Sequence, residues 1–302
     1  MNKQKIKQAK ANWVLYLMIL PAFAYVIIFH YIPMYGVQMA FRDFTLRDGM
    51  FGSAWVGLKH FRIFFSSPRS GPIIENTIKI SLYGLVAGFP IPIIFALFLN
   101  QVRMLRFKKL VQTVTYMPNF ISVVVITGMI SAFFSPNSGF INTIVEAVTG
   151  DRVFFTGTPR YFIHLFVWSG IWQGFGWSSI IYVAALSNVD MELHEAAMID
   201  GASRLQRILH IDIPSIMPTM VILLVLSAGG IMSVGFEKVY LMQNDLILTV
   251  SEVLSTYTYK QGLLQRQYSL SAAIGLFNNV VNFLMLVIVN FVAKKVNETS
   301  LW

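Results

Sequence analysis

Cysteine is absent from the 302 residues of this chain, and charged residues make up only 12% of it. Without cysteine the chain cannot form a disulfide framework, a thiol nucleophile or a cysteine-ligated zinc site. Soluble globular domains carry about 25% charged residues, so about half of the usual charge is missing. These shortages exclude a water-soluble enzyme, a disordered scaffold and a secreted disulfide protein. Together with a hydrophobic fraction of 56%, they predict an all-α polytopic membrane protein.

The motifs of common catalytic sites are also missing. No GxxxxGK[ST] phosphate-binding loop occurs, so we do not expect this chain to hydrolyse ATP itself. His194 and Glu195 begin like the HExxH motif of zinc proteases, but Met198 occupies the place of the second histidine, so no metal site is predicted. Gly174 and Gly176 lack the third glycine of a dinucleotide-binding loop. We therefore predict no catalytic residues, and a membrane enzyme is the weakest interpretation.

Six apolar stretches are long enough to cross a bilayer, which takes about 20 residues of helix. They cover residues 13–32, 77–99, 111–134, 161–186, 215–236 and 273–293. The first is too long for a signal-peptide core and is interpreted as a retained anchor. Prolines interrupt several stretches and indicate kinks, either beside a cavity or for packing. We expect one domain of six transmembrane helices over residues 13–293, flanked by tails 1–12 and 294–302.

Basic residues predict the orientation, because they concentrate in cytoplasmic loops. Basic residues are frequent in the N-terminal tail, in the connections after the second and fourth stretches, and at the C-terminus. The loops at 33–76, 135–160 and 237–272 contain fewer basic residues for their length. Both termini are therefore predicted to be cytoplasmic. The net charge of +9 fits basic loops at a lipid surface better than nucleic-acid binding. The basic residues assigned to the cytoplasm are Lys3, Lys5, Lys7, Lys10, Arg103, Arg106, Lys108, Lys109, Arg204, Arg207, Lys294 and Lys295.

The cytoplasmic connection at 187–214 is predicted to form two short helices with a break. Asp190 can cap the first helix, and the acidic side chains of its first turns suit the positive end of the helix dipole. Leu193, Ala196 and Ala197 share one face at helical spacing, and the two alanines leave that face shallow. Gly201 supplies the turn between the helices. By residue pattern alone, this is an amphipathic surface loop.

The spacing within this connection resembles a specific family pattern. The connection matches the EAA loop of ABC importer permeases, EAA-x3-G-x9-I-x-L-P. Three residues separate Glu195-Ala196-Ala197 from Gly201, and nine more separate Gly201 from the segment that ends at Pro214, in which Ile213 takes the place of leucine. The loop also stands before the second-last predicted span, as it does in that family.

The resemblance extends along most of the chain to the maltose-type sugar permeases, and to the subgroup that serves complex oligosaccharides and polysaccharide fragments. Residues 56–61 resemble that family's GLxNF segment, with His60 for asparagine. Many sugar permeases carry a GGP motif after the fifth span, whereas this chain has Gln243-Asn244-Asp245 there. Further similar segments lie at 76–77, 96–100, 118–122, 139–142, 235–240 and 257–262.

This resemblance implies a type I ABC importer permease fold in the bacterial plasma membrane. It also implies partners: a second homologous permease, two copies of an ABC ATPase, an extracellular solute-binding protein and a carbohydrate substrate. ATP and magnesium would be bound by the ATPase, and no cofactor by this chain. The first helix of the EAA loop would dock in a groove of the ATPase. The residues expected to couple the chain to the ATPase are Glu195, Ala196, Ala197, Asp200, Gly201 and Pro214.

Polar and aromatic residues within the spans are candidates for the substrate pathway, because sugars are held by aromatic stacking and by amide and hydroxyl groups. Tryptophans near span ends also serve as interfacial anchors, and asparagines within spans also join helices. The candidates are Tyr116, Asn119, Phe120, Trp168, Trp172, Gln173, Ser233, Phe236, Asn278 and Asn282.

Two other classes of function stay open at this point. One is an importer permease of the same superfamily that carries peptides, amino acids or ions. The other is a stand-alone channel or carrier. The scarcity of ionisable residues within the spans argues against this class, because proton and ion pathways normally need them. The excess of basic residues on the outer side is compatible with an acidic oligosaccharide, with lipid headgroups or with the surface of the binding protein.

Overall fold

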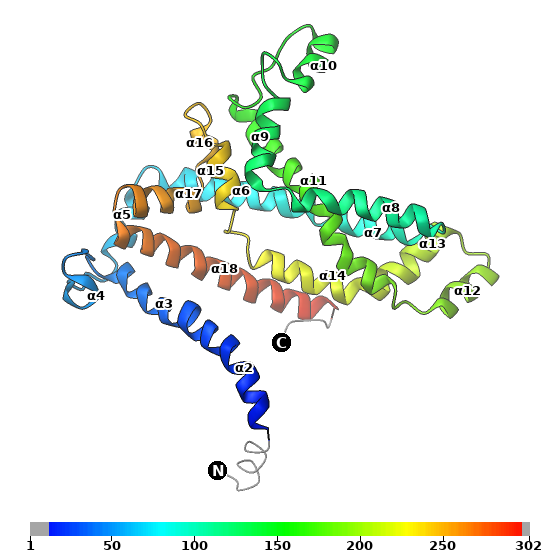
Figure 1. The fold of residues 1–302 in the computed structure, drawn as a ribbon, viewed down its shortest axis with the longest axis horizontal. Helices are drawn as coiled ribbons and strands as arrows, with labels where there is room; N and C mark the ends of the chain where they lie inside the picture. Colours follow the sequence, from blue (N-terminus) through cyan, green and yellow to red (C-terminus); the bar gives the residue numbers. More distant parts are fainter. Residues whose placement is uncertain (1–11, 298–302) are drawn as a thin grey trace. The chain divides into compact units, whose positions relative to one another are not determined.

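The computed structural model describes residues 12–297, with side chains up to Lys295. The predicted tail lysines at 3, 5, 7 and 10 lie outside the described residues. Every regular element in the described part is helical, and one isolated antiparallel bridge joins Arg42 and Trp55 (Figure 1). The all-α prediction is therefore confirmed for these residues.

The helices follow one another along the chain with short connections (Figure 1). The α-helices are α2 (Trp13–Val26), α3 (Ile32–Met34), α4 (Gly49–Gly52), α5 (Lys59–Ser66), α6 (Ser70–Gly88), α7 (Pro90–Asn100), α8 (Leu105–Tyr116), α9 (Val123–Phe133), α10 (Phe140–Thr149), α11 (Pro159–Leu186), α12 (Met191–Ile199), α13 (Arg204–Arg207), α14 (Ile213–Ala228), α15 (Phe236–Met242), α16 (Leu248–Ser251), α17 (Leu254–Tyr259) and α18 (Tyr268–Asn297). Turns of 3-10 helix (Tyr35–Phe41 and Met117–Phe120) and of π-helix (Ile27–Tyr31, Ile208–Asp212 and Lys260–Leu264) join several of them.

Four helical stretches in the described part are long and apolar enough to cross a membrane: Trp13–Phe41, Ser70–Asn100, Arg204–Ala228 and Tyr268–Lys295. A fifth is reached only if Leu105–Phe120 and Val123–Phe133 count as one span, although they are bent by 97°. α11 has 28 residues, yet it is not among the apolar stretches. The six-span count stays a prediction.

The bend between α8 and α9 has a local cause. The helical backbone continues through Met117 and ends at Ile121 and Ser122, which are both extended. The chain passes through a 3-10 turn, and α9 then begins afresh because the Ser122 hydroxyl accepts a hydrogen bond of 3.3 Å from the Val125 amide. Residues 111–134, predicted as one stretch, thus form two helices of different direction.

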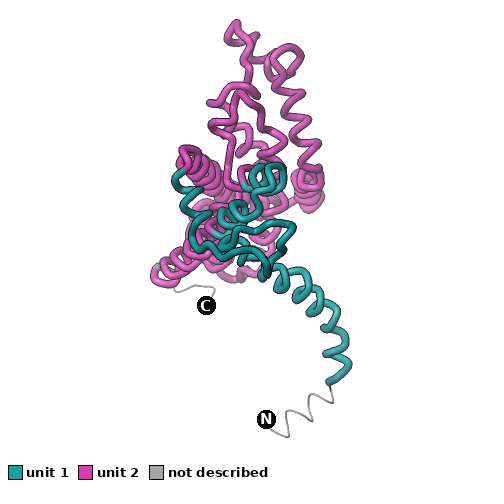
Figure 2. The backbone as a smooth tube through the Cα atoms, turned by 90° about the vertical axis from the view of Figure 1, so that its left-hand side faces the viewer, with its two compact units in different colours: residues 1–66, 258–276 teal, residues 67–257, 277–302 magenta. Residues whose placement is uncertain are grey.

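The chain divides into two compact units (Figure 2). Unit 1 comprises residues 1–66 and 258–276, and unit 2 comprises residues 67–257 and 277–302. Within unit 1, the chain around the bridge is held by aromatic packing: the Phe41 ring stacks on Trp55 at 5.5 Å, and the Arg42 guanidinium lies 5.6 Å from the centre of the Trp55 ring. The Phe44 amide donates to the Ser269 hydroxyl at 2.9 Å, which joins the two segments of this unit.

An ion pair closes the same loop of unit 1. Lys59 Nζ lies 2.6 Å from Asp43 Oδ2, and His60 Nε2 lies 3.0 Å from Asp43 Oδ1. The hydrogen bond from Lys59 holds the pKa of the Asp43 carboxyl below its ordinary value of 3.8. A carboxyl with a depressed pKa stabilises the fold above its ordinary value, and this contribution is lost as the pH falls through the folded value.

We expect Asp43→Asn to loosen this loop slightly at pH 7. Both partners are largely exposed, and such pairs contribute about 0.2–1 kcal/mol. The Val56 amide, which donates to the Phe41 carbonyl at 2.8 Å, should therefore exchange its hydrogen up to about fivefold faster than in the wild type. Hydrogen exchange corrected for intrinsic rates measures this. In the wild type the protection should fall to that of the variant below pH 3.8; equal protection at pH 7 would contradict the prediction.

Unit 2 is built around α11, which packs against α6, α7, α8 and α14. α11 and α8 approach closely at Gly176, where a Cβ atom would come within 2.1 Å of the Thr115 carbonyl oxygen of α8. No other residue fits there without moving α8.

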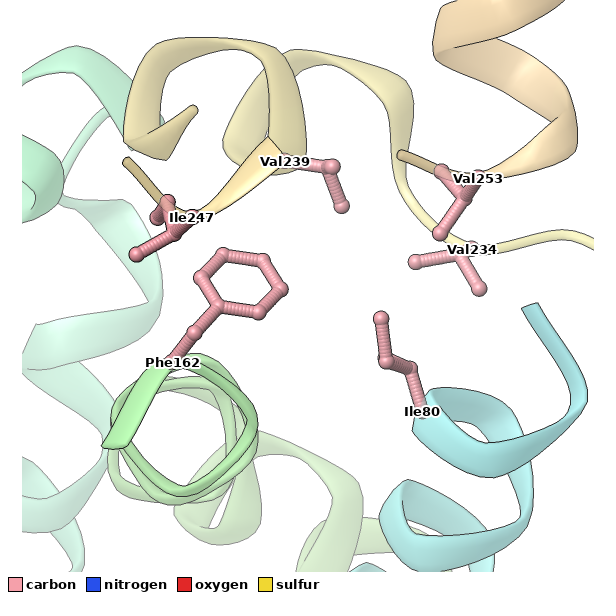
Figure 3. Close-up of a cluster of buried hydrophobic side chains, with 6 residues drawn as sticks. All are labelled: Ile80, Phe162, Val234, Val239, Ile247 and Val253. Atoms are coloured by element: carbon pink, nitrogen blue, oxygen red, sulfur yellow. The ribbon is translucent and has the colours of Figure 1, made fainter. Parts of the chain in front are cut away.

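Two buried clusters fix the ends of this packing. In the first, Phe162 of α11 and Ile80 of α6 meet side chains of the segment after α14, among them Val239 of α15 (Figure 3). In the second, Ile93, Ala96 and Leu97 of α7 pack with Tyr182 and Leu186 of α11 and with Ile216 of α14. The first cluster positions α15, and the second anchors the connection between α11 and α14.

Candidate functional site

The connection between α11 and α14 contains the two helices that the sequence predicts. α12 begins after Asp190, whose extended backbone lets its carboxylate accept a hydrogen bond of 2.9 Å from the Glu192 amide. α13 begins after Ser203, which forms a reciprocal capping box with Gln206. The predicted cap at Asp190 is confirmed.

The break between α12 and α13 depends on Gly201. Its φ of +78° lies in the left-handed region, which side chains with a Cβ atom rarely adopt. The Ala202 amide donates to the Ala197 carbonyl at 2.8 Å, and the Gly201 amide donates to the Met198 carbonyl at 3.1 Å. This pair of bonds is a Schellman motif, which ends a helix and turns the chain sharply. The predicted turn at Gly201 is confirmed.

Asp212, at the end of the π-helical turn before α14, connects three elements. Its carboxylate is fully buried. Gln101, after α7, donates to Oδ2 at 3.3 Å. His194 of α12 places Nε2 at 3.2 Å from Oδ1, within ion-pair distance, although Oδ1 has no hydrogen bond of good geometry. Asp212 thus holds α12 against the start of α14 and the end of α7.

The outer surface of α12 is unusually apolar for a polar connection. Met191, Leu193, Met198 and Ile199 are all exposed, with Ile199 at 87%. Glu195, Ala196, Asp200, Gly201 and Pro214 are exposed as well, and Ala197 is half-buried. Exposed apolar side chains grouped on one element mark a surface for a partner.

A cavity of about 880 Å³ lies among α6, α7, α11, α14 and α15. Its walls are mostly apolar and aromatic, and glycines such as Gly84, Gly170 and Gly174 keep them open. Polar groups are few, as in most small-molecule sites: Ser81, Gln173, Ser178, Tyr182, Ser227, Ser233 and Lys238.

Among the described residues that line the cavity, Lys238 is the one lysine or arginine, and its position is set by its neighbour in the chain. Val239 is fully buried in the cluster with Phe162, which presses α15 against α11 (Figure 3). The Lys238 ammonium donates to the Phe166 carbonyl at 2.9 Å and lies 4.9 Å from the centre of the Phe166 ring. Only 9% of the residue is exposed, and burial lowers the pKa of the amine to about 8.

The predicted pathway residues fall in several places. Gln173 and Ser233 line the cavity. Asn282 supports its wall, because its side chain accepts from the Met232 amide at 2.8 Å and donates to the Ser233 hydroxyl at 2.9 Å. Phe120 packs edge-on against Trp177, which lines the cavity.

Other predicted pathway residues lie apart from this cavity. Trp168 and Trp172 line a second, almost wholly apolar cavity of about 420 Å³, and the Trp168 indole donates to the Tyr83 hydroxyl at 2.8 Å. Tyr116, Asn119, Phe236 and Asn278 line neither cavity. The Asn278 amide oxygen is buried without a hydrogen-bond partner.

The segment at 243–245, where the sequence departs from the GGP pattern, holds the chain after α15 in place. Gln243 donates to the Ser251 carbonyl at 2.7 Å and to the Thr256 hydroxyl at 3.1 Å. Asn244 donates to the Thr156 carbonyl at 2.9 Å. Side-chain amides thus take part in ordering this loop.

Sequence reasoning missed Lys238 and Asp212 as members of these sites. Lys238 stood in a segment noted only for its similarity to sugar permeases, and Asp212 occupied a variable position of the EAA pattern. In both cases the available signal was a charged residue beside a long apolar stretch, where ionisable groups are rare and tend to be functional.

Comparison with known proteins shows that this chain is similar to transport proteins. Residues 88–298 match the family described as binding-protein-dependent transport system inner membrane component. Protein LplB of Bacillus subtilis (strain 168) is 38% identical over 288 residues, which cover 95% of this chain and 91% of LplB. The polygalacturonan/rhamnogalacturonan transport system permease protein YteP of the same organism is 40% identical over 288 residues, which cover 95% of this chain and 90% of YteP.

A solved structure is similar over nearly the whole chain. A chain in the crystal structure of a bacterial ABC transporter involved in the import of the acidic polysaccharide alginate has a TM-score of 0.90 and 37% sequence identity, covering 98% of this chain and 100% of that one. A chain in the crystal structure of a bacterial alginate ABC transporter in complex with an alginate pentasaccharide-bound periplasmic protein also has a TM-score of 0.90.

Proposed function

Because the chain belongs to the family of binding-protein-dependent transport system inner membrane components, and is thus a membrane-embedded transport permease, we propose that it forms the translocation path of an ATP-driven importer for complex or acidic oligosaccharides. The observation that carries the proposal is the correspondence in fold over 98% of the chain with a chain of the bacterial ABC transporter involved in alginate import. The sequence identity of 40% to YteP over 95% of the chain supports the same substrate class.

The cavity supports transport of sugars. Its mixture of aromatic side chains with a few hydroxyl and amide groups suits ligands that stack on rings and form hydrogen bonds. A volume of about 880 Å³ lies within the range of about 300–1,000 Å³ for small-molecule sites. Pathway residues such as Gln173 and Ser233 are proposed to contact the sugar directly, and Asn282 to hold the wall in place.

α12 is proposed to be the helix that couples this chain to the ATPase. Its exposed apolar side chains offer a contact surface, and the Schellman motif at Gly201 gives that surface a fixed direction. Closure of two ATPase subunits around ATP and magnesium would move α12, and Asp212 would transmit this motion to α7 and α14. A ligand that favours one of two states of a coupled element shifts the whole equilibrium.

The complete importer would contain a second homologous permease and an extracellular binding protein, and the two termini of this chain would face the cytoplasm. None of the residues of α2 is buried, so its apolar surface suits contact with lipid or with the partner permease. In this arrangement the helices that are too short or too polar to span alone, above all α11, would cross the membrane within the assembled complex.

The test is the ATPase activity of the co-expressed complex in nanodiscs, with binding protein loaded with neutral or acidic oligosaccharides. We expect one loaded binding protein to stimulate ATP hydrolysis severalfold and to drive uptake into vesicles. Stimulation only by peptide-loaded or amino-acid-loaded protein would replace the carbohydrate assignment. A chain that purifies without an ATPase would contradict the importer itself.

A further inference from the structure

Lys238 is a cation without an acidic partner in the part of the chain that the structure describes. Among residues 12–297, no carboxylate lies within 4.0 Å of its ammonium, whereas other lysines such as Lys59 and Lys79 are paired. An ammonium has three hydrogens to donate. One goes to the Phe166 carbonyl, and the ring of Phe166 covers part of the charge. The remaining donors have no partner in the described chain.

Such a group is costly to keep. Burying a charge without a counter-charge is unfavourable, and proteins normally pair it or neutralise it. Burial does lower the pKa of Lys238, but only to about 8, so the amine is mostly protonated at pH 7. The fold thus holds a positive charge against the wall of a mainly apolar cavity, where the low dielectric strengthens its attraction for an anion.

The surroundings of Lys238 leave space for a ligand. Gly170 faces the ammonium, and a Cβ atom there would lie 3.2 Å from Nζ, so any side chain would crowd the charge. Ser81 also lines the cavity, and its hydroxyl is buried without a hydrogen-bond partner. The Lys238 ammonium is the group in this cavity that can bind the carboxylate of a sugar, and Ser81 is a further polar residue of the wall.

We propose that Lys238 binds the carboxylate of an acidic sugar during passage and makes this cavity selective for uronate-containing oligosaccharides. The proposal rests on the proposed function, because it assigns a substrate class to the same cavity. In this proposal the basic residues of the outer loops do not select the substrate. The charge that distinguishes acidic from neutral sugars is that of a single buried lysine, Lys238. Lys238 would be a specificity-determining residue rather than a support for α15, which Val239 already anchors.

The test is direct binding to the assembled permease and ATPase complex in nanodiscs, without binding protein, measured by equilibrium dialysis. The probes are a pentasaccharide of uronic acids and its carboxyl-reduced counterpart. The wild type should prefer the acidic probe by about tenfold, which corresponds to about 1.4 kcal/mol. Lys238→Met should bind both probes alike, at the affinity of the wild type for the reduced probe. Lys238→Arg, which keeps the charge, should retain a preference.

Two controls show whether Lys238 binds the sugar or only supports the fold. Lys79→Met removes a lysine that is exposed and paired with Glu75, and it should leave the preference unchanged. The melting temperature of the complex should not fall in Lys238→Met, because this variant removes a buried charge that has no counter-charge. An unchanged preference in Lys238→Met, equal weakening of both probes, or no preference in the wild type would each overturn the proposal.

Failure of this proposal is distinguishable from failure of the proposed function. If the wild-type importer takes up neutral oligosaccharides and shows no preference for acidic ones, only the role of Lys238 is wrong. If it takes up no carbohydrate from any loaded binding protein, the proposed function is wrong as well.

Discussion

Gly201→Val is expected to reduce ATP-driven uptake at least tenfold while ATP hydrolysis by the complex stays within about twofold of the wild type. Gly201 has a φ of +78°, and an L-residue there costs about 1–2 kcal/mol, with more for a β-branched side chain. Relaxing this strain breaks the bonds from the amides of Gly201 and Ala202 that end α12. α12 would then change direction, and motion of the ATPase would no longer reach the spans. Uptake and ATP hydrolysis measured on the same vesicles give the ratio.

Two variants show whether conformation is the cause. Gly150, after α10, has a φ of +83° and open space around it, so Gly150→Val imposes a similar backbone strain far from α12 in sequence. It should leave coupling intact. Asparagine tolerates the left-handed region better than other residues, so Gly201→Asn should restore much of the uptake. Normal uptake in Gly201→Val, or equal loss in Gly150→Val, would refute the proposed role of α12.

Asp212→Leu is expected to cause the second large effect, a loss of coupling together with a loss of stability. Gln101 and His194 would each lose the carboxylate that they contact. Both side chains are half-buried, so leaving them unpartnered costs at most about 1–3 kcal/mol each. α12 would lose its connection to α7 and α14, so uptake should fall at least tenfold. The melting temperature of the complex and its uptake are measured together.

The chain offers a direct readout of this effect. Because it has no cysteine, Met191→Cys in the exposed first turn of α12 creates a single labelling site. A spin label there should be more mobile in Asp212→Leu than in the parent. Asp212→Asn keeps hydrogen-bonding atoms near Gln101 and His194 and should show an intermediate mobility. Unchanged mobility in Asp212→Leu would contradict the connection.

A double-mutant cycle isolates the contact between His194 and Asp212. If the two residues act through each other, the effect of Asp212→Asn on uptake should be smaller in a His194→Ala background than in the wild type. Additive effects would show that Asp212 acts through Gln101 and its buried surroundings alone.

Local sequence rules predict the connection at 187–214 well. Asp190 caps α12 and Gly201 ends it, because capping and left-handed turns depend on a few adjacent residues. They predict the spans less well, because residues 111–134 are apolar enough to suggest one span, whereas a bend of 97° lies at the extended residues Ile121 and Ser122 within that stretch. Residues 161–186 are predicted to be a span from their apolar residues, but α11 also carries indole, amide and hydroxyl groups and is not among the stretches apolar enough to cross a membrane alone.

The sequence by itself determined the class of this protein: composition required a helical membrane protein, and the spacing around Glu195 and Gly201 indicated an importer permease. Both are properties of neighbouring residues. Only the tertiary structure placed Lys238 beside Phe166, 72 positions away, and Gln101 beside Asp212, 111 positions away. Which charge faces a cavity and which carboxylate joins three helices depend on how distant segments pack, since a helical pattern specifies the buried side of an element but not its neighbour.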